Sequence, residues 1–336
     1  MRPLIVRLPN WIGDVIMSLP ALWHLHAHGY QLKLVGRGWA SALLAPCGWT
    51  VYKLPGTLRE RVTLLRQLGH DAREHDPTFQ KRLNTLLLTN SFSSALDARL
   101  AGLLAVGYRQ DARGWLLRHA HPRPRQPLHE SRRFLELAGV LAPDGLPTAD
   151  TPDTPDTPAP RPQLPVSPQA RQQLHARLHE HGLIGTDGQP LPYVCLVPFA
   201  TGTLKGANKA WPGFAELGAA LARQLPVVIA PGPGTETGLA RSNFPEAIIL
   251  ADLPLDAYAA LLADSRLVIA NDTGPGHIAA AVGARLLSVL GPTDTQRYGA
   301  LGPHVQRIQH TPWPSAAQVE AIARSALQSA GGVAAP

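Results

Sequence analysis

The chain has 336 residues, of which 45% are hydrophobic and 6% aromatic, and 31 Lys and Arg residues against 24 Asp and Glu residues give a formal net charge of +7. This composition excludes global disorder, and the length suits two domains of about 150 residues each better than one. The positive charge favours anionic partners such as nucleotides or phosphorylated glycans, although general solubility explains it equally well.

The sequence carries no signal for secretion or for crossing a membrane. The apolar run at the N-terminus is broken early by Arg7 and Asp14, no small-residue cleavage site follows, and no stretch of about 20 apolar residues occurs. Cys47 and Cys195 lie far apart between apolar residues, without metal-ligand or disulfide spacing, so we expect small core residues in a reducing compartment. These features predict a cytoplasmic protein, with peripheral contact at the inner membrane left open.

The first half of the chain alternates between predicted strands and helices. Short apolar runs at 3–8, 31–36 and 83–88 are typical of buried strands, and apolar residues recur at helical spacing over 14–28. Strands that alternate with helices predict a parallel sheet.

Residues 148–168 interrupt this alternation. The run 151–158 repeats Thr-Pro-Asp with proline at every third position, which is incompatible with helix or sheet and favours extended polyproline-like geometry. We interpret the segment as a linker. It predicts an N-terminal domain over 1–160 and a C-terminal domain over 161–336.

The second half of the chain repeats the alternation of the first. Its predicted elements are strands at 193–198, 226–230, 266–270 and 286–290, and helices at 212–224 and 276–282. Two such halves predict an α/β fold with two Rossmann-like domains, whose parallel sheets face each other across a cleft. Ligands of open α/β sheets bind at the carboxyl ends of the strands, so the loops at those ends are the candidate sites.

A glycine-rich turn, NDTGPGH at 271–277, follows one predicted strand and leads into an alanine-rich helix. Such a turn directs backbone N–H groups and the positive end of a helix at one point, which suits a phosphate. Thr273 and His277 add side-chain donors, and Asp272 offers an acceptor for a sugar hydroxyl. An ordinary helix cap by Asp272 or Thr273 is the alternative.

A second loop of small residues, TGTLKGANKAWP at 201–212, contains Lys205 and Lys209. A lysine there could neutralise a diphosphate as negative charge builds up on a leaving group. A solvated loop lysine is the alternative.

The loop NWIGD at 10–14 follows the first predicted strand. An aspartate at the start of a helix is most often a cap or a partner of the helix dipole. At the carboxyl end of a strand, Asp14 could also take a proton from an attacking hydroxyl.

Three other patterns are weaker. The glycine-rich segment 232–238 misses the dinucleotide-binding spacing by one residue, and no Walker loop occurs. His24, His26 and His28 suggest a metal cluster, but only the first and last share a helix face and no third ligand is evident, so we predict solvated side chains and no metal site. The arginine pair at 132–133 is interpreted as surface.

Five motifs, taken in order, resemble the bacterial ADP-heptose:lipopolysaccharide heptosyltransferases, which form glycosyltransferase family nine and have the GT-B fold. The motifs are the loop at 10–14, NSFSSAL at 90–96, GYRQDARG at 107–114, KAWP at 209–212 and DTGPGH at 272–277. The resemblance covers nearly the whole chain and is strongest to the heptosyltransferase II branch.

The resemblance implies inverting, metal-independent transfer of heptose from ADP-heptose to the lipopolysaccharide inner core, without a cofactor. By motif position, Asp14 would be the general base and Lys209 would stabilise the ADP leaving group. The residues that would bind the ADP-sugar donor are Thr201, Thr203, Glu236, Asp272, Thr273, Gly274 and His277. Those that would bind the phosphorylated glycolipid acceptor are Asn10, Ser91, Arg109 and Arg113.

Within the donor set, the resemblance gives the diphosphate to Thr273, Gly274 and His277, the sugar or ribose to Asp272, and the ribose to Glu236. One carboxylate base with cationic stabilisation of a departing diphosphate is what an inverting transfer needs. The loop at 201–208 is longer than is usual for the branch, so Lys205 could compete with Lys209.

Rival interpretations share parts of this pattern. Another nucleotide-sugar enzyme of GT-B fold, such as an epimerase, would need the diphosphate site but no acceptor. A non-catalytic binding module would tolerate loss of Asp14 and Lys209, yet both are present. A nucleic-acid partner is not expected, because the sequence shows neither a recognition-helix nor an aromatic-platform pattern.

Overall fold

The computed structural model describes residues 1–124, 127–145, 161–200, 203–204, 207–208, 210–291 and 293–329, and of 203–204 and 207–208 it describes the backbone alone. The chain divides into two compact units, Met1–Pro162 (unit 1) and Gln163–Pro336 (unit 2). The Thr-Pro-Asp repeat expected to link them lies outside the described residues.

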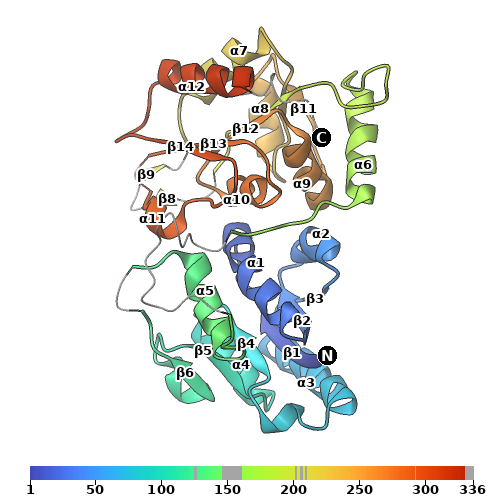
Figure 1. Cartoon of the computed structure of the whole chain (residues 1–336), viewed down its shortest axis with the longest axis vertical. Helices are drawn as coiled ribbons and strands as arrows, with labels where there is room; N and C mark the ends of the chain where they lie inside the picture. Colours follow the sequence, from blue (N-terminus) through green and yellow to red (C-terminus); the bar gives the residue numbers. More distant parts are fainter. Residues whose placement is uncertain are drawn as a thin grey trace. The chain divides into compact units, whose positions relative to one another are not determined.

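Unit 1 is built on a six-stranded sheet in the order β3-β2-β1-β4-β5-β6, and every neighbouring pair is parallel (Figure 1). Its strands are β1 (Arg2–Arg7), β2 (Tyr30–Gly36), β3 (Thr50–Lys53), β4 (Thr85–Leu87), β5 (Ala105–Tyr108) and β6 (His119–His121). Because the strands run in one direction, the loops that follow them all emerge at one edge of the sheet.

Helices cover both faces of the unit 1 sheet. They are α1 (Ile12–Ala27), α2 (Ala40–Leu44), α3 (Leu58–His75), α4 (Phe92–Leu100) and α5 (Glu130–Gly139), with short 3-10 turns at η1 (Ala45–Cys47), η2 (Phe79–Lys81) and η3 (Arg113–Leu116). Helices α1 and α5 pack side by side (Figure 1). Helices α3 and α4 contact each other over a separate apolar core that includes Ile5, Leu68 and Leu87. Both sheet faces are therefore removed from water, as a parallel sheet requires.

Unit 2 repeats this topology in a second parallel sheet, ordered β11-β10-β7-β12-β13-β14. Its strands are β7 (Val194–Val197), β10 (Val227–Ile229), β11 (Ile248–Ile249), β12 (Leu267–Asn271), β13 (Leu286–Leu290) and β14 (Val305–Gln309). A small antiparallel hairpin, β8 (Thr203–Leu204) with β9 (Ala207–Asn208), follows β7.

The helices of unit 2 are α6 (Pro168–Glu180), α7 (Phe214–Ala222), α8 (Glu236–Asn243), α9 (Leu255–Asp264), α10 (Gly274–Ala281), α11 (Thr295–Tyr298) and α12 (Ala316–Ser329). Helices α7 and α12 pack on each other over a core that includes Trp211, Leu217 and Val319. Helix α9 contacts both α6 and α10. Among the described residues, no helix combines the length and apolar character that crossing a bilayer requires.

The predicted fold class, two parallel α/β sheets with helices, is confirmed. Strand β13 matches its predicted range, and both cysteines are buried free thiols, as predicted. Helix α1 differs, because it begins at Ile12 rather than Asp14. Trp11 is its N-cap residue and Asp14 is the third helical residue, so the carboxylate lies within the first turn and not at the cap position.

Candidate functional site

In each unit the strand order reverses beside the first strand. In unit 2 this point lies between β7 and β12, and in unit 1 it lies between β1 and β4. A crevice opens at such a switch point in open α/β sheets, because the loops on its two sides diverge to opposite faces. The motifs at 10–14 and 90–96 follow β1 and β4, and those at 201–212 and 271–277 follow β7 and β12.

Asn271, the last residue of β12, holds the unit 2 loops together. Its side chain is fully buried. The amide oxygen accepts a 2.9 Å hydrogen bond from the backbone N–H of Trp211, and the amide nitrogen donates to the carbonyl of Pro198 at 2.9 Å. One amide thus ties Pro198 and Trp211, which flank the loop after β7, to the end of β12.

The glycine-rich turn leads directly into α10. Thr273 is the N-cap residue, and its hydroxyl makes no capping bond to the helix. Pro275 occupies the first turn, where its missing N–H costs no hydrogen bond. Gly276 is needed for close packing, because a Cβ there would lie 3.0 Å from the carbonyl oxygen of Asn271. The first turn of α10 therefore presents a helix N-terminus at the sheet edge, a position that favours an anion.

His277 and Asp272 flank this helix start. Nε2 of His277 lies 3.9 Å from Oδ1 of Asp272, and the two side chains are only 7% and 11% exposed. The structure thus brings Asp272, Thr273, Gly274 and His277 together in one turn beside the switch point. Their enclosure from bulk water strengthens any charged contact that they make with a ligand.

Glu236 begins α8, after β10, which neighbours β7 at the same edge. Its Oε2 accepts a 2.7 Å hydrogen bond from the backbone N–H of Gly232. A Cβ at Gly232 would come within 2.9 Å of that oxygen, so the glycine is required for the contact. Part of the carboxylate's hydrogen-bonding capacity therefore serves to fold the segment 232–236.

Four predicted residues belong to the loop after β7. Donor residue Thr201, the catalytic candidate Lys209 and its competitor Lys205 lie outside the described residues, and donor residue Thr203 is described only as backbone on β8. Their predicted roles stay predictions.

Arg307, on β14, is a charged residue near this site that the sequence reasoning did not identify. Its guanidinium donates to the carbonyl of Ala300 at 2.7 Å. Although much of the residue is exposed, desolvation lowers the pKa of its guanidinium, and the nearby Asp272 carboxylate opposes that shift. No motif marks this position, since only the sheet brings β14 close to the turn after β12.

In unit 1, Arg7 fixes the loop that precedes α1, the helix that carries Asp14. Its guanidinium donates to the side-chain oxygen of Asn10 at 2.7 Å and also to the carbonyl of Leu8. Burial, reinforced by the positive charge of Arg37, lowers the pKa of Arg7 to about 10, so it remains charged at neutral pH. Asn10 is thus held in the loop that leads into α1, and Asp14 is partly exposed one turn further on.

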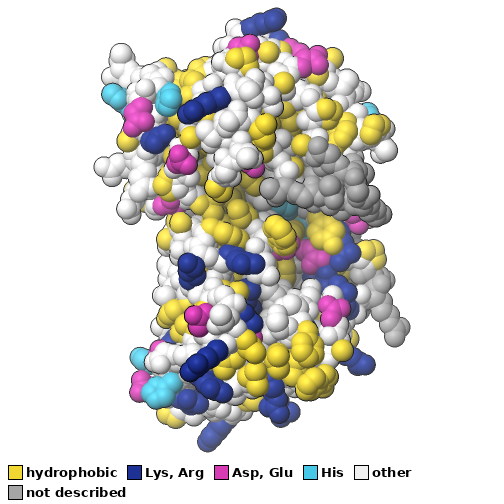
Figure 2. All heavy atoms as spheres, turned by 180° about the vertical axis from the view of Figure 1, so that it is seen from behind, with side chains coloured by type: hydrophobic (Ala, Val, Ile, Leu, Met, Phe, Trp, Pro, Cys, Tyr) yellow, Lys and Arg dark blue, Asp and Glu magenta, His cyan; other side chains and the backbone are white. Residues whose placement is uncertain are grey.

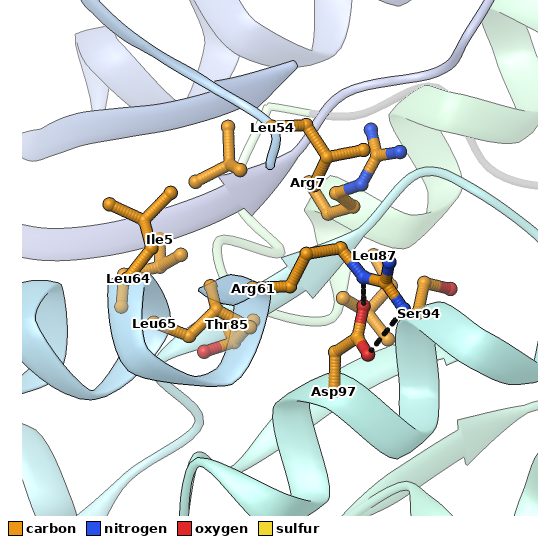
Figure 3. A pocket seen from close by; sticks show the side chains of 11 residues that line it. Ile5, Arg7, Leu54, Arg61, Leu64, Leu65, Thr85, Leu87, Ser94 and Asp97 are labelled. Atoms are coloured by element: carbon orange, nitrogen blue, oxygen red, sulfur yellow. Dashed lines mark hydrogen bonds and ion pairs between the residues drawn. The ribbon is translucent and has the colours of Figure 1, made fainter. Parts of the chain in front are cut away.

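A small pocket beneath this edge is lined by the stem of Arg7 and by an ion pair between α3 and α4 (Figure 3). Nε of Arg61 lies 2.7 Å from Oδ2 of Asp97, and a second contact of 3.3 Å makes the pair bidentate. The guanidinium of Arg7 points away from this pair (Figure 3). Because both partners are largely buried, the pair fastens the two helices together.

Ser91 caps α4 at the end of β4. Its hydroxyl accepts a hydrogen bond from the backbone N–H of Ser94 at 3.3 Å, and the residue is exposed. The Ser91 hydroxyl thus lies after β4 at the carboxyl edge of the sheet. Strand β4 is the neighbour of β1, which precedes the helix with Asp14.

Arg113 corrects a prediction. Expected to contact the acceptor, it is fully buried. Its guanidinium donates to the carbonyls of Thr89 at 2.5 Å, Tyr108 at 2.9 Å and Ser91 at 3.3 Å. Burial lowers the pKa of Arg113 to about 10. The side chain connects the loop after β5 to the loop after β4, so it presents no charge to a ligand in this conformation. Arg109, by contrast, is exposed on the same loop.

The arginine pair at 132–133 also differs from its prediction as surface. Both residues are buried. Arg133 forms an ion pair with Glu130, and its guanidinium lies 5.1 Å from the ring centroid of Tyr108. The tyrosine hydroxyl donates to Glu136 at 2.9 Å. Burial raises the pKa of Glu136.

Of the histidines near the end of α1, His26 is exposed as predicted, whereas His24 and His28 are only partly exposed. His24 is partly buried and hydrogen-bonds through Nε2 to the carbonyl of Ala142 at 2.8 Å, and its ring lies 4.2 Å from that of His28. The described residues contain one group with metal-ligand spacing, His70, Asp71 and Glu74, on the surface of α3. It lies in the half of α3 that leads to the amino edge of the sheet, away from the switch point of unit 1.

On the face drawn in Figure 2, Lys and Arg side chains are dispersed among neutral and hydrophobic ones. On that face, the net positive charge does not form the continuous stripe expected of a nucleic-acid-binding surface.

Comparison with known proteins gives a family match. Residues 84–324 match the sequence model described as "Glycosyltransferase family 9 (heptosyltransferase)". The chain is 27% identical to lipooligosaccharide heptosyltransferase 2 of Haemophilus influenzae over 308 residues, which are 86% of this chain and 83% of the relative.

Solved structures show the same fold. The ADP-heptose lipopolysaccharide heptosyltransferase II of E. coli aligns with a TM-score of 0.76 and 22% identity, over 99% of this chain and all of that one. The E. coli heptosyltransferase WaaC, solved with ADP, aligns with a TM-score of 0.67 and 20% identity, over 97% of this chain and 100% of that one. These likenesses confirm the GT-B type of fold expected from the sequence.

Proposed function

Because the chain belongs to glycosyltransferase family 9, we propose that it transfers heptose from ADP-heptose to the lipopolysaccharide inner core with inversion at the anomeric carbon. The family match makes the chain a glycosyltransferase. The observation that supports the proposal best is the turn at 272–277, where a helix N-terminus, a nearly buried histidine and a nearly buried aspartate meet at a switch point. The relatives named above are heptosyltransferases, one of them solved with ADP.

Unit 2 would bind the donor. Thr273, Gly274 and His277 would hold the diphosphate at the start of α10, because backbone N–H groups and the helix dipole both favour negative charge there. Asp272 would accept a hydrogen bond from a hydroxyl of the sugar or ribose.

The remaining donor contacts come from neighbouring loops. Glu236 would reach the ribose with the carboxylate oxygen that does not bind Gly232. Thr201 and Thr203 would also bind the donor, and Lys209 would stabilise its diphosphate, from the loop whose flanking residues Asn271 anchors.

Unit 1 would bind the acceptor. Asn10 and Ser91 would hydrogen-bond to it from the loops after β1 and β4, and the exposed Arg109 would pair with a phosphate. Arg113, which is buried, would act indirectly by holding the loops after β4 and β5 together. Asp14 lies in the first turn of α1, beside these loops.

The reaction follows from these positions. Asp14 would take the proton from the attacking acceptor hydroxyl, whose oxygen forms a bond to the anomeric carbon. The bond from that carbon to the ADP oxygen breaks, and the electron pair leaves with ADP. Lys209 and the start of α10 would stabilise the charge that develops on the diphosphate. One displacement with one carboxylate base inverts the anomeric centre, whereas retention by double displacement would need a second, nucleophilic carboxylate.

The proposal also implies a cellular location. Its acceptor is a glycolipid, so the chain would act in the cytoplasm, at the surface of the inner membrane, and the net charge of +7 would favour anionic headgroups there.

Product analysis by mass spectrometry tests the proposed function. The purified chain is incubated with a heptose-deficient core acceptor and either ADP-heptose or a UDP-sugar, and with each donor alone. We expect one heptose to be added to the acceptor from ADP-heptose only, with release of ADP. Conversion of the donor sugar in the absence of acceptor would favour the epimerase alternative. Transfer from UDP-sugars alone would contradict the donor assignment.

A further inference from the structure

Two solvent-exposed aromatic side chains contact each other at the carboxyl edge of the unit 1 sheet. Phe92, the first residue of α4, is 40% exposed, and Trp115, in η3, is 73% exposed. Their ring centroids lie 6.2 Å apart with the planes inclined at 56°. Large aromatic side chains normally bury most of their surface, so an exposed pair at a candidate site indicates a surface that is covered by a ligand.

The pair extends along the sheet edge toward Asp14. Phe92 follows β4 and Trp115 follows β5, which are neighbouring strands. On the other side of β4 lies β1, which is followed by Trp11, itself 70% exposed. Three adjacent strands thus end in loops that each expose one aromatic ring, and the loop with Trp11 leads into the helix that carries Asp14.

The loop that presents Trp115 is held in a strained conformation. Asp111 and Ala112 both have left-handed backbones, with φ of 49° and 56°. Such φ angles are uncommon for residues other than glycine, and they persist where surrounding contacts impose them, often at binding sites. Arg113, the next residue, ties this loop to its neighbour, because its buried guanidinium donates to the carbonyls of Thr89 and Ser91 in the loop after β4 and of Tyr108 at the end of β5. The same guanidinium therefore connects the segment before Phe92 with the segment that carries Trp115.

The surroundings of the pair are polar and include charges of both signs. Ser91 and Ser93 are exposed beside Phe92. Arg109 is exposed, and its stem runs next to Gly114, where an added Cβ would lie 3.4 Å from its Cγ. The carboxylate of Asp111 is also exposed on this loop and accepts a hydrogen bond from Gln110.

We propose that Phe92 and Trp115 form a platform on which one sugar ring of the phosphorylated acceptor stacks, with Arg109 paired to its phosphate. This inference rests on the proposed function and identifies what recognises its acceptor. A pyranose ring has an apolar C–H face, which packs on the negative face of an aromatic ring, and a rim of hydroxyls. Serine hydroxyls and a guanidinium around a small aromatic surface match that rim and an anionic substituent. A lipid surface would instead be bound through a larger apolar face flanked by many Lys and Arg side chains, and the vesicle experiment below separates that occupant from a sugar ring.

Steady-state kinetics on single variants test the platform. The acceptor is a deacylated, phosphorylated inner-core oligosaccharide, and the donor is ADP-heptose at saturation. We expect Trp115→Ala and Phe92→Ala to raise the acceptor KM by about 5- to 100-fold, the range that loss of one stacking ring produces elsewhere. The dissociation constant for ADP should change less than about twofold, because the donor contacts lie in unit 2.

Matched variants separate stacking from folding. Trp115→Phe keeps a ring and should retain most of the acceptor affinity. Leu100→Ala removes an exposed apolar side chain of 45% exposure at the opposite end of α4, and should leave the acceptor KM unchanged. Arg109→Ala should abolish the preference for the phosphorylated over the dephosphorylated oligosaccharide, while the response to Trp115→Ala stays.

Two outcomes would overturn the platform. One is an unchanged acceptor KM in both alanine variants. The other is a loss that occurs only with acylated acceptor in phosphatidylglycerol-containing vesicles and not with the deacylated oligosaccharide, which would assign the rings to the bilayer. Failure of the proposed function is distinguishable, because the wild type would then form no product. Calorimetric titration of the phosphorylated oligosaccharide into Trp115→Ala and Trp115→Phe would still decide whether the rings bind a saccharide.

Discussion

The two units have the same strand order, yet the loops at their switch points are joined by different kinds of side chain. In unit 2, a neutral amide, Asn271, bridges two backbone groups as both donor and acceptor. In unit 1, a charged guanidinium, Arg113, bridges three carbonyls as a donor only. Both side chains are fully buried, so in both units the fastening removes a polar group from water.

The difference matches what each edge would bind. In unit 2, the N-cap residue of α10, Thr273, makes no side-chain cap bond, and the short Asn271 binds the backbone of Trp211 at the end of the loop after β7. That arrangement leaves backbone donors for a diphosphate. Unit 1 uses a long side chain to reach across two loops, and the loops so joined expose aromatic rings and one arginine. One topology therefore supports an anion site in one unit and a mixed apolar and polar surface in the other.

The largest expected effect is loss of the base in unit 1. We expect Asp14→Asn to lower kcat by about 10²- to 10⁴-fold, because a positioned general base contributes that much. Asp71→Asn, which neutralises a carboxylate on α3 in the same unit, is the control and should leave kcat unchanged. If Asp14→Asn turns over at a near-normal rate, Asp14 serves only the helix and unit 1 has another base.

The second largest expected effect is the loss of the catalytic lysine of unit 2. We expect Lys209→Ala to lower kcat by about 10²- to 10³-fold, because it removes one stabiliser of a developing negative charge. Lys209 stands three residues before Pro212, close to Trp211, whose N–H is held by Asn271. Lys205→Ala should have a modest effect on donor affinity only. The reverse ordering of the two variants would mean that the longer loop has moved the catalytic charge.

A smaller effect on kinetics is expected from replacing Arg113 or Asn271, the buried side chains that join the switch-point loops. Arg113→Lys and Asn271→Ala should each lower the free energy of unfolding by about 1–3 kcal/mol for each buried group left without a partner, as measured by urea titration. Arg113→Lys should raise the KM for acceptor, and Asn271→Ala the KM for donor. Asn243→Ala, at the exposed end of α8, is the control. If both variants raised the KM of the same substrate, the assignment of the acceptor to unit 1 and of the donor to unit 2 would be wrong.

The sequence predicted those parts of the fold that local pattern determines. Apolar runs placed β13 correctly, and a strand followed by a glycine-rich turn placed the start of the donor site. Helix α10 nevertheless begins at Gly274, two residues earlier than predicted, because proline is accepted in a first helical turn. Helix α3 was not predicted, although its signal is present: Thr57 and Glu60 form a capping box.

The position of Arg113 could not be predicted in the same way. A basic residue in a glycine-containing loop is normally exposed, and local sequence gives no reason to bury it. Its burial depends on carbonyls from Thr89 and Ser91, which come from the loop after a neighbouring strand. The arginine pair at 132–133 is buried for a similar reason, since Tyr108 and Glu130 surround Arg133. Pairings of this kind appear only when the sheet is assembled.

Calorimetric titration with ADP tests most directly whether donor binding belongs to unit 2 and base chemistry to unit 1. Asp14→Asn should bind ADP within about twofold of the wild type, while His277→Gln should bind it about tenfold or more weakly, since a hydrogen bond to a charged group is worth about 1.5–3 kcal/mol. Melting temperatures of both variants check that they remain folded. Equal loss of ADP affinity in the two variants, or unchanged affinity in His277→Gln, would contradict the account.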